Sequence, residues 1–245
     1  MGAHGPRAGA ALRVQSLSAP LKPPPDRLYG RARGHALRPR QERLLAEVLP
    51  RLRLDPAQAA DLAAAFAPRA AEVWLEVGCG SGEHALALVA RHPGIGLIAS
   101  EVFANGLASL LGALAPETVP LPGNLRLWDE DARALIRLLR ASSLSRLFVL
   151  FPDPWPKARH AKRRFIHPAL LPEIARVLRP GAEWRVATDD PTHQAWLEEV
   201  FAAQTLFAAP PPATRRPDDW PPTRYEAKAL AAGRQPRYWT LRRAG

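Results

Sequence analysis

The sequence predicts an α/β domain with a parallel central sheet, an antiparallel closing strand and helices on both faces. From about residue 73 onward, short apolar runs alternate with stretches of helical spacing. The chain has 245 residues, of which 47% are apolar, enough for one such domain with an N-terminal arm. A glycine-rich turn after the first strand and acidic residues after later strands lie where open α/β sheets bind ligands.

Six strands are expected where short apolar runs end in polar or glycine-containing turns. They cover residues 73–77, 97–100, 125–128, 147–151, 184–188 and 238–241. Apolar positions at helical spacing follow each of the first five strands. The corresponding helices are predicted over residues 84–91, 106–114, 132–139, 168–178 and 192–201. A proline-rich loop at residues 210–222 and a short helix at residues 225–233 precede the closing strand.

Composition divides the chain into three parts. Residues 1–27 are predicted to be a disordered basic tail, because acidic side chains are missing almost throughout it. An organelle transit segment is the alternative, but the prolines of this tail break an amphipathic helix. Residues 28–70 form an arm with a helix over residues 41–54, and residues 71–245 form the α/β domain.

The net charge of +11 predicts a polyanionic partner, and nucleic acid is the commonest one. An arginine-rich composition without functional meaning is the alternative. Neither a membrane span nor a secretory signal is expected, because no apolar run is long enough, and we expect a cytoplasmic protein. Cys79 is the single cysteine and the seven histidines lack ligand spacing, so no metal site is expected.

The first strand runs into the turn Gly78-x-Gly80-x-Gly82. This spacing fits neither the dinucleotide fingerprint nor the phosphate-binding P-loop. An acid two positions before the first glycine, here Glu76, is instead typical of Rossmann-like methyltransferases. Their cofactor, S-adenosylmethionine, carries an ammonium group and a sulfonium, which a carboxylate attracts. Cys79 is interpreted as a small loop residue rather than a nucleophile.

Further acids follow the next strands of the predicted sheet. Glu101 ends the second strand, where α/β nucleotide binders place the acid that accepts both ribose hydroxyls. Asp131 follows the third strand, in reach of an adenine amino group. Each acid alone could be a solvated loop residue, but three at one sheet edge favour a cofactor site. The expected cofactor-binding residues are Glu76, Gly78, Gly80, Glu101, Asp131 and Asp153.

The fourth strand leads into a rigid acid and a run of cations. Asp153 lies between Pro152 and Pro154, which restrict the backbone, and Trp155 follows. The basic run comes next, with Lys157, Arg159, His160, Lys162, Arg163 and Arg164. Charge placed beside an aromatic ring suits a flat base and the phosphates that flank it.

Residues 151–164 (FPDPWPKARHAKRR) closely resemble the signature of the bacterial tRNA (guanine-N7-)-methyltransferases. Three further segments are similar to that family: residues 76–80, 187–189 (ATD) and 223–226 (TRYE). Residues 29–34 with Gln41 also look like its N-terminal segment, so the resemblance covers about residues 28–243. Pro156 stands where the family often has His, and Tyr225 where Phe or another residue occurs.

This resemblance implies an S-adenosylmethionine-dependent methyltransferase domain that methylates guanine N-7 in the variable loop of tRNA. Asp153 would be the catalytic residue. Substrate contacts are implied at Lys157, Asp189, Thr223, Arg224, Tyr225 and Glu226. RNA contacts are implied at Arg159, His160, Lys162, Arg163 and Arg164. The resemblance also implies tRNA as the partner, with no obligate protein partner, and an enzyme that is a monomer or a homodimer.

Guanine N-7 carries a free lone pair, so catalysis would rest on positioning and on a carboxylate that favours the developing cation. A nucleic-acid amino-methyltransferase and an RNA-binding module on a decayed methyltransferase fold are the two alternatives. The spacing of Thr223 and Glu226 also fits a capping box, and Asp189 and Asp190 could cap the next helix.

Overall fold

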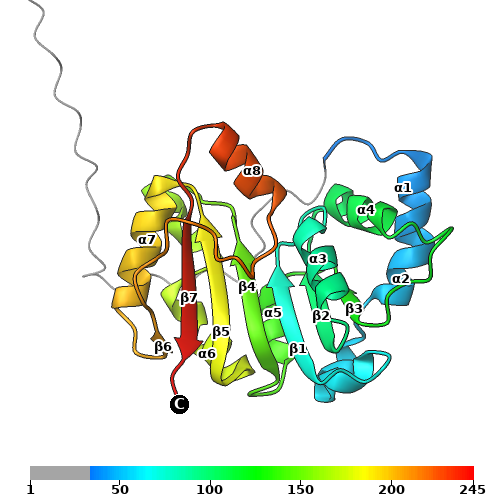
Figure 1. The fold of residues 1–245 in the computed structure, drawn as a ribbon, viewed down its shortest axis with the longest axis horizontal. Helices are drawn as coiled ribbons and strands as arrows, with labels where there is room; N and C mark the ends of the chain where they lie inside the picture. The colour runs from blue at the N-terminus through cyan, green and yellow to red at the C-terminus, as the bar shows by residue number, and fades with distance from the viewer. Residues whose placement is uncertain (1–33) are drawn as a thin grey trace, which may run out of the picture.

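The computed structural model describes residues 34–245, which form a seven-stranded sheet flanked by helices (Figure 1). The strands are β1 (Glu72–Val77), β2 (Ile95–Ser100), β3 (Leu125–Trp128), β4 (Leu144–Leu150), β5 (Leu178–Thr188), β6 (Phe207–Ala208) and β7 (Arg237–Arg243). The helices are α1 (Pro39–Arg43), α2 (Leu49–Leu52), α3 (Glu83–Arg91), α4 (Ala104–Ala113), α5 (Ala132–Leu138), α6 (Leu171–Val177), α7 (Pro191–Ala202) and α8 (Arg224–Ala231). The predicted tail at residues 1–27 lies outside the described residues, as do arm residues 28–33.

The strand order is β3-β2-β1-β4-β5-β7-β6, and the strands from β1 to β5 pair in parallel. Strand β7 runs antiparallel to β5, and β6 runs antiparallel to β7. The predicted parallel sheet with an antiparallel closing strand is therefore confirmed. The strand order reverses between β1 and β4, and open α/β sheets bind ligands outside the carboxyl ends of the strands at such a point.

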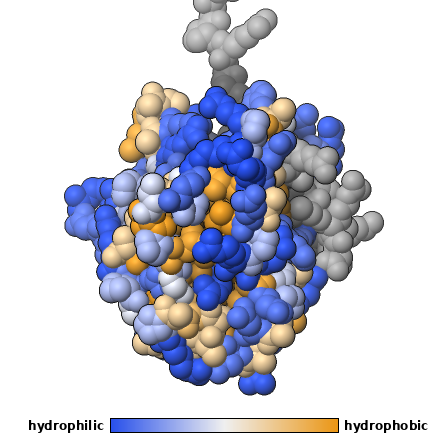
Figure 2. Space-filling view, turned by 90° about the vertical axis from the view of Figure 1, so that its right-hand side faces the viewer, coloured by the Kyte–Doolittle hydropathy of each residue, from blue (hydrophilic) through white to orange (hydrophobic). Residues whose placement is uncertain are grey.

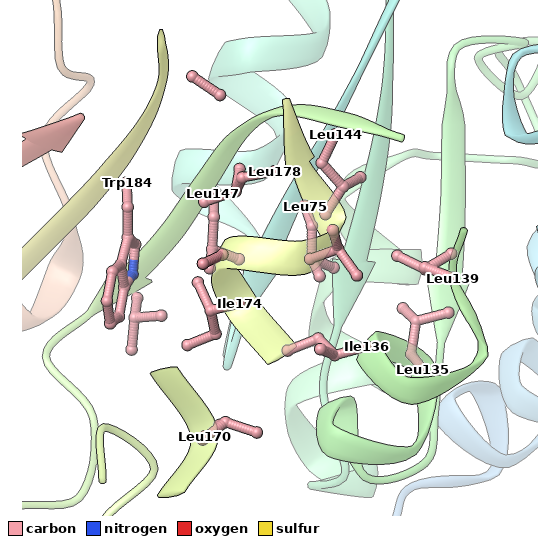
Figure 3. Close-up of a cluster of buried hydrophobic side chains, with 14 of the residues drawn as sticks. Leu75, Leu135, Ile136, Leu139, Leu144, Leu147, Leu170, Ile174, Leu178 and Trp184 are labelled. Atoms are coloured by element: carbon pink, nitrogen blue, oxygen red, sulfur yellow. The ribbon is translucent and has the colours of Figure 1, made fainter. Parts of the chain in front are cut away.

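Side chains alternate between the two faces along each strand, because successive residues of a strand point to opposite sides. Leu75 of β1 and Leu147 of β4 belong to the core beneath helices α5, α6 and α7. Figure 3 shows this core, where both leucines lie near Ile174 of α6. All three are fully buried, and each such side chain stabilises the fold by roughly 1.5–3 kcal/mol.

The opposite face of the sheet is covered by α3, α4 and the N-terminal helical segment. Trp74 and Leu97 from the sheet meet Leu88 of α3, Leu110 of α4 and Leu49 of the N-terminal segment in a second core. Figure 2 shows the molecule from the side that carries α1 and α2. On this side an apolar area is surrounded by hydrophilic residues. The sheet is thus covered by helices on both faces, as predicted.

The predicted helix at residues 41–54 instead runs from Pro39 to Leu52 and contains one wide turn, Leu44–Val48. In this turn the Leu49 N–H donates to the Leu44 carbonyl, five residues back. Pro50 is the physical reason, because its ring clashes with the preceding helical turn and it has no N–H to donate. The apolar spacing located the helix correctly but could not show the wider turn.

Among the other boundaries that differ from the prediction, two concern α6 and β5. The expected helix at residues 168–178 is a 3-10 turn, Pro168–Leu170, followed by α6. Strand β5 begins at Leu178, which pairs with Leu144, well before the predicted start at residue 184. Gly181 interrupts this strand with a φ of +75°. The Pro-Gly pair at residues 180–181 is typical of a turn, which hid the first half of the strand.

Candidate active site

Four of the predicted acids lie at the carboxyl edge of the parallel strands. Glu76 is the second-last residue of β1 and pairs with Ala99 of β2. Glu101 follows β2 directly, and Asp131 and Asp153 each come three residues after the ends of β3 and β4. Figure 1 shows α8 above this edge, at the end opposite the C-terminus. The structure therefore brings these side chains to one edge, near the point where the strand order reverses.

The glycine turn presents its backbone to open space. Gly78 and Gly80 have φ values of +73° and +57°, which side chains larger than hydrogen rarely adopt. The N–H groups of Gly78 and Cys79 both donate to the Ser100 carbonyl, at 2.8 and 3.0 Å. A Cβ added at Gly78 would meet no atom within 4 Å. Burial raises the pKa of the Cys79 thiol well above its usual value, which fits a structural residue.

Glu101 connects the second strand to the glycine turn. Its Oε2 accepts the Gly80 N–H at 2.8 Å. Its Oε1 accepts the N–H groups of Val102 and Phe103, at 2.8 and 2.9 Å. A carboxylate has about four acceptor positions, so three backbone contacts leave room for a ligand hydroxyl. Glu101 is thus held rigidly by the loops that it joins.

Glu76 is buried and paired with a residue that the sequence did not reveal. Its Oε2 lies 2.9 Å from Nδ1 of His84, and both side chains are almost fully buried. The edge of the His84 ring lies against Phe148 of β4, with ring centroids 5.1 Å apart. His84 comes two residues after the last glycine of the turn. Its closeness in sequence to that turn and to Glu76 is the one signal that could have indicated its role.

Asp131 is less free than expected. Its side chain caps α5 by accepting the Arg133 N–H at 2.9 Å. The Arg133 guanidinium also donates to this carboxylate, with Nη2 2.6 Å from Oδ2. A ligand amine at Asp131 would therefore share the carboxylate with Arg133.

Asp153 lies on a strained loop that we call the Asp153 loop, residues 151–157. The side chain of Asp153 is exposed. Phe151 and Trp155 on either side have φ values of +51° and +45°, a region that side-chain-bearing residues rarely occupy. The Phe151 N–H donates to the Ala187 carbonyl of β5 at 2.7 Å, which anchors the loop at its start.

The basic run divides into two groups. Lys157, Arg159 and Lys162 are exposed, and the residues from Ala158 to Arg163 form a 3-10 turn. Desolvation and the nearby Arg163 lower the pKa of His160, which favours the neutral form of its ring. His160 and Arg163 both lie against the Trp155 ring.

Arg164, expected among the RNA contacts, is the exception. It is only 5% exposed. Its Nε and Nη2 donate to the carbonyls of Pro154 and Trp155, at 3.0 and 3.2 Å. The guanidinium also lies over the Trp196 ring of α7, 4.8 Å from the centroid. A guanidinium that faces the interior does not fit the expected contact with a phosphate.

The segment at residues 223–226 lies beside the glycine turn. Thr223 caps α8 by accepting the Glu226 N–H at 3.0 Å, so the predicted helix start is confirmed. Arg224 is exposed, as is 55% of Tyr225. The Tyr225 ring lies 3.7 Å from the position of a Cβ on Gly80. Helix α8 therefore reaches the turn through Tyr225.

Glu226 points away from this opening. It is 6% exposed and accepts from Arg216 Nε at 3.0 Å and from the Tyr238 hydroxyl at 2.6 Å. The burial of Tyr238 and the Glu226 carboxylate raise the pKa of its phenol. In the structure Glu226 therefore holds α8 on β7, and Arg216 and Tyr238 are the partners that the motif did not indicate.

The two acids after β5 have different partners. Asp190 caps α7 by accepting the His193 N–H at 2.8 Å. Asp189 forms an ion pair with Arg234, beyond α8. Only Asp190 fills the capping role considered for both acids. Asp189 instead links the end of β5 to the segment that leads into β7.

Other kinds of site find no support in residues 34–245. They contain no cluster of three or more His, Cys, Asp or Glu that could hold a metal ion. Within the same range, no helix is both long and apolar enough to cross a membrane. A hollow of about 300 Å³ lies at the opposite edge of the sheet, where Glu72 and Arg179 line it. It is thus remote from the acids described above.

Comparison with known proteins gives consistent matches. A family model described as "Putative methyltransferase" matches residues 70–237. The tRNA (guanine-N(7)-)-methyltransferase of Granulibacter bethesdensis is 58% identical over 225 residues, 89% of this chain and 96% of that protein. The protein of the same name from Rhodospirillum rubrum is 46% identical over 234 residues, 91% of each.

Solved structures agree on the fold. The 16S rRNA methyltransferase KamB has a TM-score of 0.56 at 19% identity, over 78% of this chain and 95% of that one. The antibiotic-resistance methyltransferase Kmr has a TM-score of 0.52 at 23% identity, over 76% and 93%. The fold is therefore that of the Rossmann-like methyltransferases. With its high identity to curated relatives over most of its length, the chain belongs to the family of the tRNA (guanine-N(7)-)-methyltransferases.

Proposed function

We propose that this chain transfers the methyl group of S-adenosylmethionine to N-7 of a guanine in the variable loop of tRNA. One arrangement carries this proposal in addition to family membership. Asp153 follows the strand beside Glu76 and precedes the exposed cations Lys157 and Arg159. An acidic cofactor side and a basic nucleic-acid side thus meet at one sheet edge. Residues 71–245 would form the catalytic domain.

The residues present fit the cofactor. The space in front of Gly78 is open, and two carboxylates, Glu76 and Glu101, lie at the same turn. Glu76 is suited to an ammonium group, because His84 occupies one oxygen and fixes the direction of the other. Glu101 is suited to a ribose hydroxyl, because the backbone holds it at the turn and leaves one acceptor position free. When bound, S-adenosylmethionine supplies an electrophilic methyl group on a sulfonium.

The reaction requires little acid–base catalysis from the protein. Guanine N-7 already carries the lone pair that attacks, so no proton has to be removed first. Methylation places positive charge on the guanine ring, and an exposed carboxylate at Asp153 would stabilise that charge. Tyr225, which is half exposed beside the glycine turn, offers an aromatic surface for a base. The remaining task of the site is to position the base and exclude water.

The exposed cations of the basic run should make tRNA binding salt-dependent. Each contact with a phosphate releases condensed counterions, which contributes about 0.7–0.9 to the log–log salt slope. We expect the double variant Arg159→Gln/Lys162→Gln to bind tRNA with a slope shallower by roughly 1.5. Binding titrations over a series of NaCl concentrations measure this slope. Arg69→Gln is the control, because this exposed arginine pairs with Asp61 far from the site. An unchanged slope in the double variant would mean that these cations only face solvent.

The decisive test of the activity is methyl transfer from labelled S-adenosylmethionine to bulk tRNA. We expect the label in 7-methylguanosine after digestion of the tRNA to nucleosides. A transcript with 7-deazaguanine at the target position should accept no methyl group, because its ring lacks the N-7 lone pair. Label in an exocyclic amino group would instead assign the chain to amino-methylation. Binding of tRNA without any transfer would leave an RNA-binding module.

A further inference from the structure

Arg164 is a buried arginine directly behind the Asp153 loop. Its two donors reach two successive carbonyls of that loop, those of Pro154 and Trp155, at 3.0 and 3.2 Å. Pro154 is the residue that follows Asp153. The forked guanidinium can span two adjacent carbonyls, which a single ammonium group cannot do with the same geometry. The contact thus fixes the backbone one residue away from the carboxylate.

The loop needs such a hold. Phe151 and Trp155 both adopt left-handed φ values, which are strained for a residue with a side chain. Pro152, Pro154 and Pro156 contribute no N–H groups, so the loop has few donors with which to fix itself. The Arg164 contacts use its carbonyls instead. A strained, donor-poor loop therefore depends on an outside donor to keep one conformation.

Arg164 is itself held by the helix that follows β5. Its guanidinium stacks on Trp196 of α7, and the Trp196 Nε1–H donates to the Ile166 carbonyl at 2.8 Å. Burial lowers the pKa of the arginine, while the charges of Asp190 and Glu199 oppose this shift. His193 next to this group has a pKa lowered to about 3, so it stays neutral and does not repel the guanidinium. Helix α7 thus provides a rigid base for the loop.

We propose that Arg164 is a positioning residue, which fixes the backbone beside Asp153 through Pro154 and Trp155 so that the carboxylate faces the base. The role of Arg164 thus differs from that of Arg159 and Lys162 in the same run, which remain the candidates for phosphate contacts. The part of this inference that concerns catalysis rests on the proposed function.

The test compares Arg164→Lys with the wild-type chain and with the control Arg69→Lys. Single-turnover rates with tRNA and S-adenosylmethionine saturating should fall about 10- to 100-fold in Arg164→Lys, as expected when a reacting group is displaced. The Kd for each ligand should stay within about 2-fold of wild type. The log–log salt slope for tRNA should stay within about 0.3 of wild type. Because Arg164 acts through Asp153, the double variant Asp153→Asn/Arg164→Lys should be no slower than Asp153→Asn alone.

Hydrogen exchange gives a second measurement that needs no activity. The amide of Phe151, which donates to the Ala187 carbonyl at the start of the Asp153 loop, should exchange at least about 10-fold faster in Arg164→Lys, with the rest of the sheet unchanged. A shallower salt slope with normal exchange would overturn the proposal and make Arg164 an RNA contact. Wild-type turnover, or faster exchange throughout the domain, would overturn it as well. If wild type itself transfers no methyl group, the proposed function fails, and loop exchange still decides whether Arg164 holds the loop.

Discussion

Asp153→Asn is expected to lower the single-turnover rate of methyl transfer about 100-fold, which corresponds to about 2.7 kcal/mol of transition-state stabilisation. Asn has nearly the same shape as Asp and retains a hydrogen-bonding group, but it carries no charge. If the carboxylate stabilises the cation that develops on guanine, removing the charge affects the transition state more than the bound substrate. Saturating both ligands in the single-turnover assay separates this effect from binding.

The affinity for tRNA should stay close to wild type in this variant, because Asp153 is one exposed acid beside several exposed cations. Asp218→Asn serves as the matched control, since Asp218 is also exposed and lies on the proline-rich loop before α8. A variant that kept more than half of the wild-type rate would show that Asp153 has only a structural role in the loop after β4.

Glu101→Ala is expected to weaken S-adenosylmethionine binding about 100-fold while tRNA affinity stays nearly unchanged. The change removes a carboxylate that accepts three backbone N–H groups and holds the glycine turn against the end of β2. Hydrogen bonds to a charged group are worth about 1.5–3 kcal/mol each, so the turn loses its order as well as a ligand contact. Isothermal titration calorimetry with S-adenosylmethionine measures the effect.

Glu83→Ala is the control for this experiment, because Glu83 is an exposed acid at the start of α3, close to the same turn. Glu76→Ala is a less clean test than Glu101→Ala, since it leaves the buried His84 without its carboxylate partner. Unchanged cofactor affinity in Glu101→Ala would remove this residue from the cofactor site. A general loss of stability is recognised by a fall in melting temperature together with a fall in tRNA affinity.

Much of the fold could be predicted from the sequence because local patterns determine it. The consecutive apolar residues Val73, Trp74 and Leu75 point to alternate faces of the sheet and belong to the two cores. A continuous apolar run of this kind is typical of a strand in a sheet that is covered on both sides. Boundaries were less certain wherever proline or glycine intervened. Pro50 widened a helix and Gly181 concealed half of β5, because the response of the backbone to these residues depends on its neighbours.

The location of the candidate site could be predicted because the order of strands and acids along the chain determines which acids lie at one edge of the sheet. The carboxyl ends of parallel strands lie at the same edge of a sheet. Acids at or just after these ends therefore lie at that edge, as Glu76, Glu101 and Asp153 do. The roles of individual side chains were less accessible. Glu226 belongs to the resembling motif but is buried against Tyr238, and the partner of Glu76 is His84, which belongs to none of the quoted motifs.

The sequence by itself determined the fold class, the family resemblance, the edge of the sheet that holds the site and the basic character of its surroundings. These follow from spacing, composition and the direction of the strands, which are properties of the chain. Only the tertiary structure decided that Arg159 faces solvent while Arg164 turns inward to the Asp153 loop and Trp196. Both are arginines of one run, and what separates them is the burial and the carbonyl partners that other elements provide.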